Sequence, residues 1–354
     1  MINVTQTFVP PAEEYIAILQ EAFDKKWLTN RGVLVTRLEK KLKEFLGVPH
    51  LTLTTNGTLP IQIAIKSLGL KGEIITTPFS YVATVSSIVW ENCAPVFVDI
   101  HPEYLTIDEA KIEEKITDKT SAILATHVFG NPCAVEKIEE IAKKHNLKVI
   151  YDAAHCFGVQ YKGKSIFNYG DVSTCSFHAT KIFHTGEGGC WMTNDDELQK
   201  KLYYHHNFGH NGPESFLGLG INAKISELQA AMGLAVYNHL DEVFLGRKKA
   251  VEKYQELLKD SGLQFLKLRE GTEWNYHYFP VIFSSEEELL EAMKKMNQQQ
   301  IFPRRYFYPS LNQLPYIQNQ PCEISESISK RVLCLPLFAD ITEEQIDFIT
   351  NILK

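Results

Sequence analysis

The sequence predicts an α/β fold in which helices pack on a mainly parallel sheet, followed by a smaller α+β domain. Between residues 51 and 194, short apolar or β-branched runs alternate with helical stretches. Parallel strands need helical crossovers of this kind, so a layered domain is expected. The chain has 354 residues, enough for two domains. We place the large domain, which includes an N-terminal helical segment, at 1–240 and the small C-terminal domain at 241–354.

Two helices are predicted before the sheet. Two prolines followed by acidic residues mark the start of the first helix near Pro10, and the second is expected from Val33 to Leu46. The apolar residues of each helix recur at the spacing of one helical face. They are Tyr15, Ile16, Leu19, Ala22 and Phe23 in the first helix, and Leu34, Leu38, Leu42 and Phe45 in the second.

The remaining elements follow from the same patterns. Strands are predicted at 51–55, 73–77, 95–99, 121–128, 148–151, 172–177 and 190–193, and helices at 59–68, 80–90, 108–116 and 134–145. Helices are then expected at 195–206, 225–237 and 241–258. In the small domain, strands are expected at 274–283 and 331–337, and helices at 286–296 and 342–353. The loop at 207–222 is long and rich in glycine and asparagine, which is typical of a functional loop.

Composition argues against several classes of protein. The net charge is −7 and the pI is near 6.0, so a nucleic-acid binder with a basic surface is not expected. The chain has no apolar run long enough to span a membrane and begins without a secretory signal. Its seven cysteines are scattered and form no Cys-x-x-Cys, which indicates reduced core cysteines in a cytoplasmic protein.

Two kinds of enzyme are disfavoured by their missing motifs. The spacing of the histidines matches no zinc signature, so no metal is expected. No Gly-x-Gly-x-x-Gly follows the first strand, which argues against a dinucleotide-dependent oxidoreductase.

Residues 176–189 contain a single lysine, Lys181, among small, aromatic and hydroxyl side chains. A lysine held between two buried strands loses hydration, which lowers its pKa and makes the amine a usable nucleophile. Such a lysine can form a Schiff base with an aldehyde such as pyridoxal phosphate. A solvated lysine in a surface loop would explain the same stretch, so other residues must decide.

Three further features occur at predicted strand ends. Asn56, Gly57 and Thr58 open a helix, where free N–H groups can bind phosphate, although a plain turn fits equally. Tyr81 could stack on a flat ring or belong to the core. Asp152 ends a strand, where a carboxylate can pair with a protonated pyridine nitrogen. Ser176, five residues before Lys181, is another possible phosphate ligand.

With these motifs the chain resembles the DegT/StrS family of sugar aminotransferases, which use pyridoxal 5'-phosphate and have the aspartate-aminotransferase fold, fold type I. The similarity covers nearly the whole chain, and its most specific segments are 55–58, 77–84, 152–155, 176–181 and 222–227. The resemblance implies a homodimer with shared active sites. The cofactor-binding residues that it implies are Gly57, Thr58, Tyr81, Asp152, His155, Ser176, Lys181 and, from the other subunit, Asn222.

The resemblance also implies catalytic roles and a substrate class. Lys181 would be the Schiff-base lysine and proton carrier, and Asp152 would hold the pyridine nitrogen. The sequence Ser-Phe-His-Ala-Thr-Lys at 176–181 is similar to relatives that act at C-4 of a sugar. The implied substrates are L-glutamate and a nucleotide-linked 4-keto-6-deoxyhexose such as dTDP-4-keto-6-deoxyglucose, as in making O-antigen amino sugars. Candidate substrate-binding residues are Arg31, His184, Lys224 and Tyr308, with Arg304 and Arg305.

Two alternatives stay open within the family. A relative acting at C-3 of the sugar would share most of these motifs. A non-catalytic regulatory relative would be expected to lose Lys181 or Asp152, and both are present.

Overall fold

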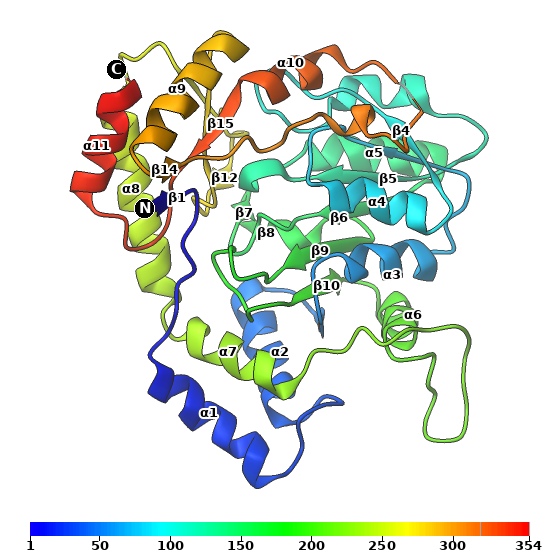
Figure 1. The fold of residues 1–354 in the computed structure, drawn as a ribbon. Coiled ribbons are helices and arrows are strands. Elements are labelled where there is room, and N and C mark those ends of the chain that lie inside the picture. The colour runs from blue at the N-terminus through cyan, green and yellow to red at the C-terminus, as the bar shows by residue number, and fades with distance from the viewer. Residues whose placement is uncertain (319, 354) are drawn as a thin grey trace.

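The computed structural model describes residues 1–318 and 320–353, and its large domain is built on a seven-stranded mixed sheet (Figure 1). The strand order is β2-β10-β9-β6-β5-β3-β4. Strands β9, β6, β5, β3 and β4 pair in parallel, while β10 is antiparallel to both β9 and β2. The strands are β2 (His50–Thr54), β3 (Glu73–Thr76), β4 (Ala94–Phe97), β5 (Thr120–Thr126), β6 (Lys148–Asp152), β9 (Val172–Ser176) and β10 (Gly189–Thr193). The predicted α/β architecture is confirmed.

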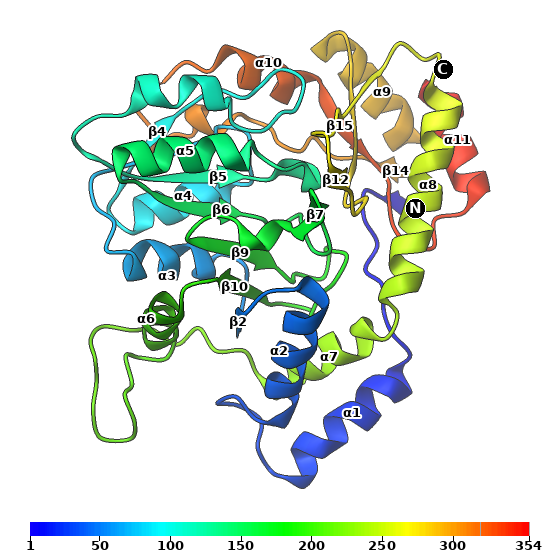
Figure 2. The same cartoon turned by 180° about the vertical axis from the view of Figure 1, so that it is seen from behind.

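Helices cover both faces of this sheet. Figures 1 and 2 show α3 and α4 on one face and α5 on the other, with α2 and α7 beside the β2 end. Alternate residues of β5 point into different cores: Ile123 packs with α2, α5 and α7, whereas Leu124 packs with α3, α4 and α6. The helices are α1 (Ala12–Asp24), α2 (Val33–Leu46), α3 (Leu59–Ser67), α4 (Val82–Trp90), α5 (Val135–His145), α6 (Asp196–His206) and α7 (Glu227–Tyr237).

A buried carboxylate joins α7 to α2. Glu227 is fully buried, and its two oxygens accept hydrogen bonds from the backbone N–H groups of Leu34 (2.7 Å) and Val35 (3.2 Å). These N–H groups have no partner inside the helix, so a carboxylate at this point satisfies them and complements the helix dipole. Gly32 precedes the helix because a Cβ there would lie 2.7 Å from the Glu227 carboxyl carbon.

The small domain has its own core and sheet. Strands β11 (Gln264–Phe265), β13 (Phe279–Ile282) and β15 (Val332–Leu335) form an antiparallel sheet. Helices α8 (Leu240–Leu258), α9 (Glu286–Gln298) and α11 (Glu343–Leu353) pack against it, and α10 (Glu323–Arg331) leads into β15. The N-terminus also reaches this domain, because β1 (Ile2–Asn3) pairs in parallel with β14 (Ile301–Phe302).

Two predicted elements differ from the structure. The predicted helix at 108–116 is two short 3-10 turns, Glu109–Lys111 and Glu113–Lys115, because Ile116 is already extended and turns the chain toward β5. Of the strand predicted at 274–283, only Phe279–Ile282 (β13) forms a strand. Before it, Trp274 donates to the carbonyl of Phe129, and Asn275 donates to those of His155 and Phe157. Bonds to the large domain therefore replace sheet pairing there.

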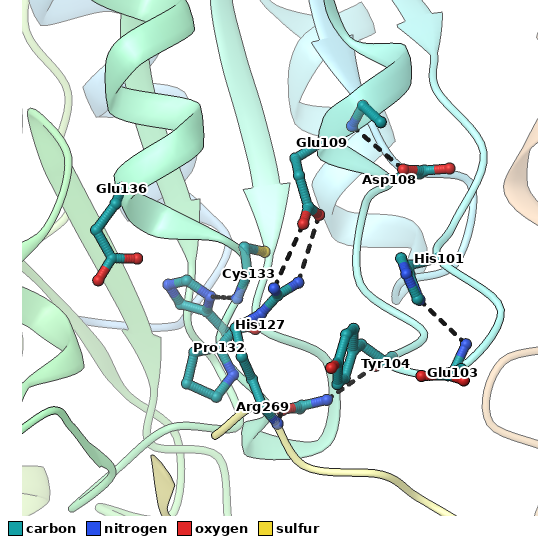
Figure 3. A network of polar contacts seen from close by, with 12 residues as sticks. His101, Glu103, Tyr104, Asp108, Glu109, His127, Pro132, Cys133, Glu136 and Arg269 are labelled. Atoms are coloured by element: carbon teal, nitrogen blue, oxygen red, sulfur yellow. Dashed lines mark hydrogen bonds and ion pairs between the residues drawn. The ribbon is translucent and has the colours of Figure 1, made fainter. Parts of the chain in front are cut away.

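The segment before β13 is attached to the large domain at a second place (Figure 3). Arg269 donates to the carbonyl of Pro132 (3.1 Å), faces both carboxylate oxygens of Glu109 at 3.4 Å, and lies 4.5 Å over the ring of Tyr104. Nearby, β12 (Thr272–Glu273) pairs with β7 (Gln160–Tyr161), which pairs with β8 (Lys164–Ser165). These contacts position residues 274–278, and hence Tyr278, against the large domain.

Candidate active site

A cavity of about 270 Å³ lies where the large and small domains meet. Strands β2, β3, β6 and β9 end at the same edge of the sheet, which is where ligands of such sheets bind. Residues from the small domain close the other side. The lining comprises Asn56, Gly57, Thr58, Ile61, Tyr81, Ala83, Asp152, Ala154, His155, Ser176, His178, Thr180, Lys181, Glu187, Tyr278, Arg304, Tyr306 and Phe307.

Lys181 follows β9 and points into this cavity. Its Nζ lies 3.4 Å from the hydroxyl of Tyr278, and it forms no ion pair within the described part of the chain. Burial lowers the pKa of Lys181, although Tyr306 and Asp152 act in the opposite direction. Desolvation disfavours the ammonium form, so the structure supplies the physical condition for a nucleophilic amine.

Asp152 ends β6 on the floor of the cavity and is 5% exposed. Its Oδ2 accepts a hydrogen bond from Thr84 (2.6 Å), and its Oδ1 accepts one from the Ala154 N–H (3.1 Å). Burial raises the pKa of Asp152, which the bond from Thr84 counteracts. No side-chain cation of the described residues lies within ion-pair distance of it. A protonated pyridine nitrogen would provide the missing positive charge.

His155 is held as a neutral side chain. Its Nδ1 accepts a hydrogen bond from the Phe129 N–H (3.1 Å), so the ring proton resides on Nε2. Burial, with Lys181 nearby, lowers the pKa of His155 well below its usual value. The ring is parallel to that of Phe307, with centroids 5.8 Å apart. His155 therefore has one fixed N–H that can donate to an acceptor in the cavity.

Gly57, Thr58 and Ser176 form the end of the cavity expected to hold phosphate. A Cβ on Gly57 would lie 2.7 Å from the Ser176 Cβ, so only glycine allows this close approach. Asn56 shapes the turn by accepting from the N–H groups of Thr58 (2.9 Å) and Leu59 (3.0 Å). The hydroxyls of Thr58 and Ser176, at the point where Gly57 lets the two segments approach, make this end of the cavity polar and suited to an anion. The residues present therefore fit a phosphorylated pyridine.

Of the other predicted site residues, some line the cavity and others lie outside it. Tyr81 lines the cavity and is 54% exposed, as a residue that stacks on a bound ring requires. Asn222 is exposed and outside the cavity of its own chain, as expected for a residue that acts in another subunit. His184 lies outside the lining of the cavity, because its buried ring contacts the Phe8 carbonyl (2.7 Å) and the Gly186 N–H (3.2 Å), and its role as a substrate ligand stays a prediction.

Arg31, Lys224 and Tyr308 are also outside the lining. Arg31 donates twice to the buried carboxylate of Glu39, at 2.9 and 2.7 Å, so its charge is already balanced. Lys224 donates to Asn207 (2.9 Å), and the ring of Tyr308 packs 3.7 Å from the guanidinium of Arg305. Within one chain, none of these three side chains reaches the cavity.

Of the small-domain residues that line the cavity, sequence reasoning named Arg304 but missed Tyr278, Tyr306 and Phe307. It also missed Thr84 of α4 as a partner of Asp152. The sequence around Tyr278 resembles an ordinary core. The run of arginine and tyrosine at 304–308 was a usable signal for a binding surface. Thr84 lies within a motif that the sequence identified, but only the folded structure places it against Asp152.

Among the residues that the structure describes, no group of three or more histidine, cysteine or acidic side chains is arranged to hold a metal ion. None of the helices in 1–318 or 320–353 is long and apolar enough to cross a bilayer.

Because several histidines are buried, we expect the free energy of unfolding to decrease in acid. Burial lowers the pKa of each of them, and for two it lies at about 3. The unfolded chain therefore binds more protons than the folded one below pH ~6.5, and stability falls as pH falls. For His127 and His206, whose pKa lies at about 3, this amounts to about 1.4 kcal/mol each between pH 7.5 and 5.5. The group comprises His127, His155, His184, His206 and His277.

The variant His206→Phe isolates one of these contributions. Neither ring nitrogen of His206 forms a hydrogen bond of ordinary geometry with a described residue, so the substitution breaks no such bond. Urea unfolding of both proteins at pH 7.5 and 5.5 should show that the variant loses about 1.4 kcal/mol less than the parent. Burial raises the pKa of Glu39 and Asp152, which has the opposite effect on stability in acid. This effect is the same in both proteins and cancels in the comparison. Equal losses in the two proteins would contradict the prediction.

Known proteins similar to this chain share both its length and its fold. The model of the DegT/DnrJ/EryC1/StrS aminotransferase family matches residues 11–354. A dTDP-4-amino-4,6-dideoxy-D-glucose transaminase of Shigella dysenteriae is 42% identical, over 100% of this chain and 98% of the relative. An enzyme of the same name from Escherichia coli is 38% identical, over 99% and 98%. The crystal structure of DesI with its TDP-sugar product superposes with a TM-score of 0.94 at 30% identity, covering 99% of this chain and 92% of that one.

Proposed function

Because this chain belongs to the DegT/DnrJ/EryC1/StrS aminotransferase family, we propose that it transfers the amino group of L-glutamate to C-4 of dTDP-4-keto-6-deoxyglucose. It is a sugar aminotransferase whose cofactor is pyridoxal 5'-phosphate. The observation that carries the substrate proposal is the full-length identity of 42% to a transaminase named for a 4-amino sugar. The sequence Ser-Phe-His-Ala-Thr-Lys at 176–181, which is similar to that of relatives acting at C-4, also favours amination at C-4 over C-3.

The side chains of the cavity have complementary tasks in this reaction. Bound pyridoxal phosphate supplies an aldehyde that accepts amines and a ring that withdraws electrons. Lys181, whose pKa is lowered by burial, would be the amine that binds the aldehyde and the base that moves a proton. Asp152 would pair with the ring nitrogen, and the Nε2–H of His155 would donate to an oxygen on the ring. Gly57, Thr58 and Ser176 hold the phosphate.

Arg304 is our candidate for binding the anionic group of a substrate. It lines the cavity, is exposed, and forms no ion pair with the residues that the structure describes. Its backbone is fixed by two hydrogen bonds with Cys334, at 3.1 and 2.8 Å. A guanidinium binds a carboxylate through two parallel hydrogen bonds, which suits glutamate. The sequence indicated Arg304 only among several cations, and the structure distinguishes it from Arg31 and Arg305, both of which have carboxylate partners.

We further propose that two copies of the chain build each site. The loop after α6 extends away from the body of the molecule in Figure 1 and ends near Asn222. Its apolar side chains are between 42% and 69% exposed, an arrangement that favours burial against a partner. A second copy covering this loop would receive Asn222 at its phosphate end. The exposed side chains are Phe208, Phe216, Leu217, Leu219 and Ile221.

Subunit mixing tests the shared site. Asn222→Ala and Lys181→Ala should each impair turnover, but in a mixed dimer one site has both wild-type residues. Refolding or co-expressing the two variants in equal amounts should restore about a quarter of wild-type activity, because half of the dimers carry one intact site. A mixture no more active than its components would contradict a shared site. Mixing Lys181→Ala with Asp152→Asn serves as the control, because both residues belong to the same chain's cavity and the mixed dimer has no intact site.

The substrate is tested with a panel of keto-sugar nucleotides. The protein loaded with pyridoxal phosphate is incubated with L-glutamate and either dTDP-4-keto-6-deoxyglucose, its GDP and UDP counterparts, or a 3-keto isomer. Mass spectrometry should show an amine in place of the ketone, and NMR should place it at C-4. Amination only at C-3 would contradict the regiochemistry, and consumption of no keto sugar in the presence of glutamate would contradict the substrate proposal.

A further inference from the structure

A chain of three buried hydroxyl groups ends at Asp152. Thr126 lies 3.0 Å from Ser80, Ser80 lies 2.7 Å from Thr84, and Thr84 lies 2.6 Å from the carboxylate, all measured between oxygens. The hydroxyl-bearing side chains are at most 3% exposed. They come from different elements: the end of β5, the turn after β3, and α4. The fold therefore brings together three otherwise unremarkable residues behind the floor of the cavity.

The direction of the three bonds is determined by proton counting. An ionised carboxylate can only accept, so the single proton of Thr84 is directed at Asp152. Ser80 must then donate to Thr84, and Thr126 must donate to Ser80. Thr84 and Ser80 each donate one bond and accept another, and hydrogen bonds linked in this way strengthen one another in a low dielectric. All three dipoles consequently point toward Asp152.

We propose that Thr84, supported by Ser80 and Thr126, is a positioning residue that keeps Asp152 ionised and oriented toward the pyridine nitrogen. This inference rests on pyridoxal phosphate being the cofactor, and it is independent of which sugar is aminated. Asp152 is buried, and none of the described side-chain cations lies within ion-pair distance of it, so its charge depends on the hydrogen bonds that it accepts. The other titratable groups that interact with it are Lys181, Cys156 and Cys175.

Thr84 also fixes which way the carboxylate faces. With Oδ2 bound by Thr84 and Oδ1 by the Ala154 N–H, both oxygens have one protein partner. Carboxylate oxygens accept more than one bond, so each retains capacity for a donor from the cavity. Without Thr84, a buried carboxylate could rotate or take up a proton, and a neutral carboxyl would not hold a pyridinium.

The test compares Thr84→Val, which removes the hydroxyl at nearly constant volume, with Thr84→Ser, which retains it. Thr76→Val is the matched control, since the Thr76 hydroxyl is equally buried but has no hydrogen-bond partner. Ser80→Ala tests the next bond, with Ser87→Ala in the same region as its control because the Ser87 hydroxyl also lacks a partner. Urea unfolding identifies any variant that has lost its fold.

Two quantities are measured on each apoprotein titrated with pyridoxal phosphate: the dissociation constant, and the ¹⁵N chemical shift of ring-labelled cofactor. For Thr84→Val we expect the dissociation constant to rise about tenfold or more, since a hydrogen bond to a charged group is lost. The ¹⁵N shift should move from the protonated toward the neutral pyridine value. Ser80→Ala should change both quantities in the same direction but less, and Thr84→Ser and both controls should match wild type.

Several results would overturn the inference. A wild-type ¹⁵N shift in Thr84→Val and in Ser80→Ala would show that the hydroxyl chain does not maintain the charge of Asp152. An equal effect in Thr84→Ser or Thr76→Val would indicate packing rather than hydrogen bonding. Failure of the wild-type apoprotein to bind pyridoxal phosphate would overturn the cofactor site itself. If instead the cofactor results are as expected and only the keto-sugar assay fails, the substrate proposal alone is contradicted.

Discussion

Lys181→Ala should abolish turnover while leaving the fold intact. In the proposed mechanism the side chain supplies both the amine that exchanges with the substrate amine and the base that moves the proton, and no other lysine of the described residues lines the cavity. General acid–base catalysis alone contributes about 10²- to 10⁴-fold, so we expect kcat to fall by at least about 10⁴-fold when both functions are lost. Stability should change little, because among the described residues the Lys181 side chain forms a single long hydrogen bond, to Tyr278 at 3.4 Å.

The measurement is a single turnover with glutamate, monitored through the loss of the absorbance band near 400 nm. Urea unfolding is measured in parallel. Lys164→Ala provides the control, because Lys164 is an exposed lysine on β8 that forms no ion pair within the described residues. Turnover of Lys181→Ala at the wild-type rate would show that a different group carries the chemistry.

Asp152→Asn should weaken cofactor binding and strongly reduce kcat. Asparagine has the same shape and can still accept the hydrogen bond from Thr84, but it carries no negative charge to stabilise a protonated pyridine nitrogen. The ring then withdraws electrons less effectively in the transition state. Removal of a preorganised electrostatic partner costs about 10²- to 10³-fold in rate, and we expect a fall in kcat of that order.

This variant also separates charge from packing. The dissociation constant for pyridoxal phosphate and kcat should both change, whereas the urea midpoint should not fall, since burial of the carboxylate is itself unfavourable. Asp196→Asn is a suitable control, because the Asp196 side chain is 83% exposed and pairs only with His50. Unaltered kinetics of Asp152→Asn would contradict the role of this carboxylate.

Local sequence signals placed Lys181, Asp152, Gly57 and Ser176 at or just after the ends of strands, and the structure brings all four to the lining of one cavity. The apolar or β-branched runs of these strands are visible in the sequence, and parallel strands bring their carboxyl ends to one edge. The failed helix at 108–116 shows the limit of this approach. An acidic start and helical spacing were present, but the return of the chain to β5 leaves room only for two short turns.

The small-domain side of the site could not be predicted from spacing. Tyr278 and Tyr306 are far from Lys181 in the sequence, and their positions depend on contacts such as those of Arg269 and Asn275 with the large domain. His184 was named as a substrate ligand because a histidine near the lysine motif fits that role in the sequence, but the structure places it outside the cavity lining. Its bond to Phe8, 176 residues away, becomes visible only in the folded chain.

The most direct test of the central claim is chemical trapping of the protein loaded with pyridoxal phosphate. Sodium borohydride reduces the bond between the cofactor and a lysine amine to a stable link, and proteolysis with mass spectrometry then locates the pyridoxyl group. The structure predicts the label on Lys181, in the peptide that follows β9, and no label in Lys181→Ala. A pyridoxyl group on another lysine, or none on any peptide of the loaded protein, would contradict the assignment of this cavity as the active site.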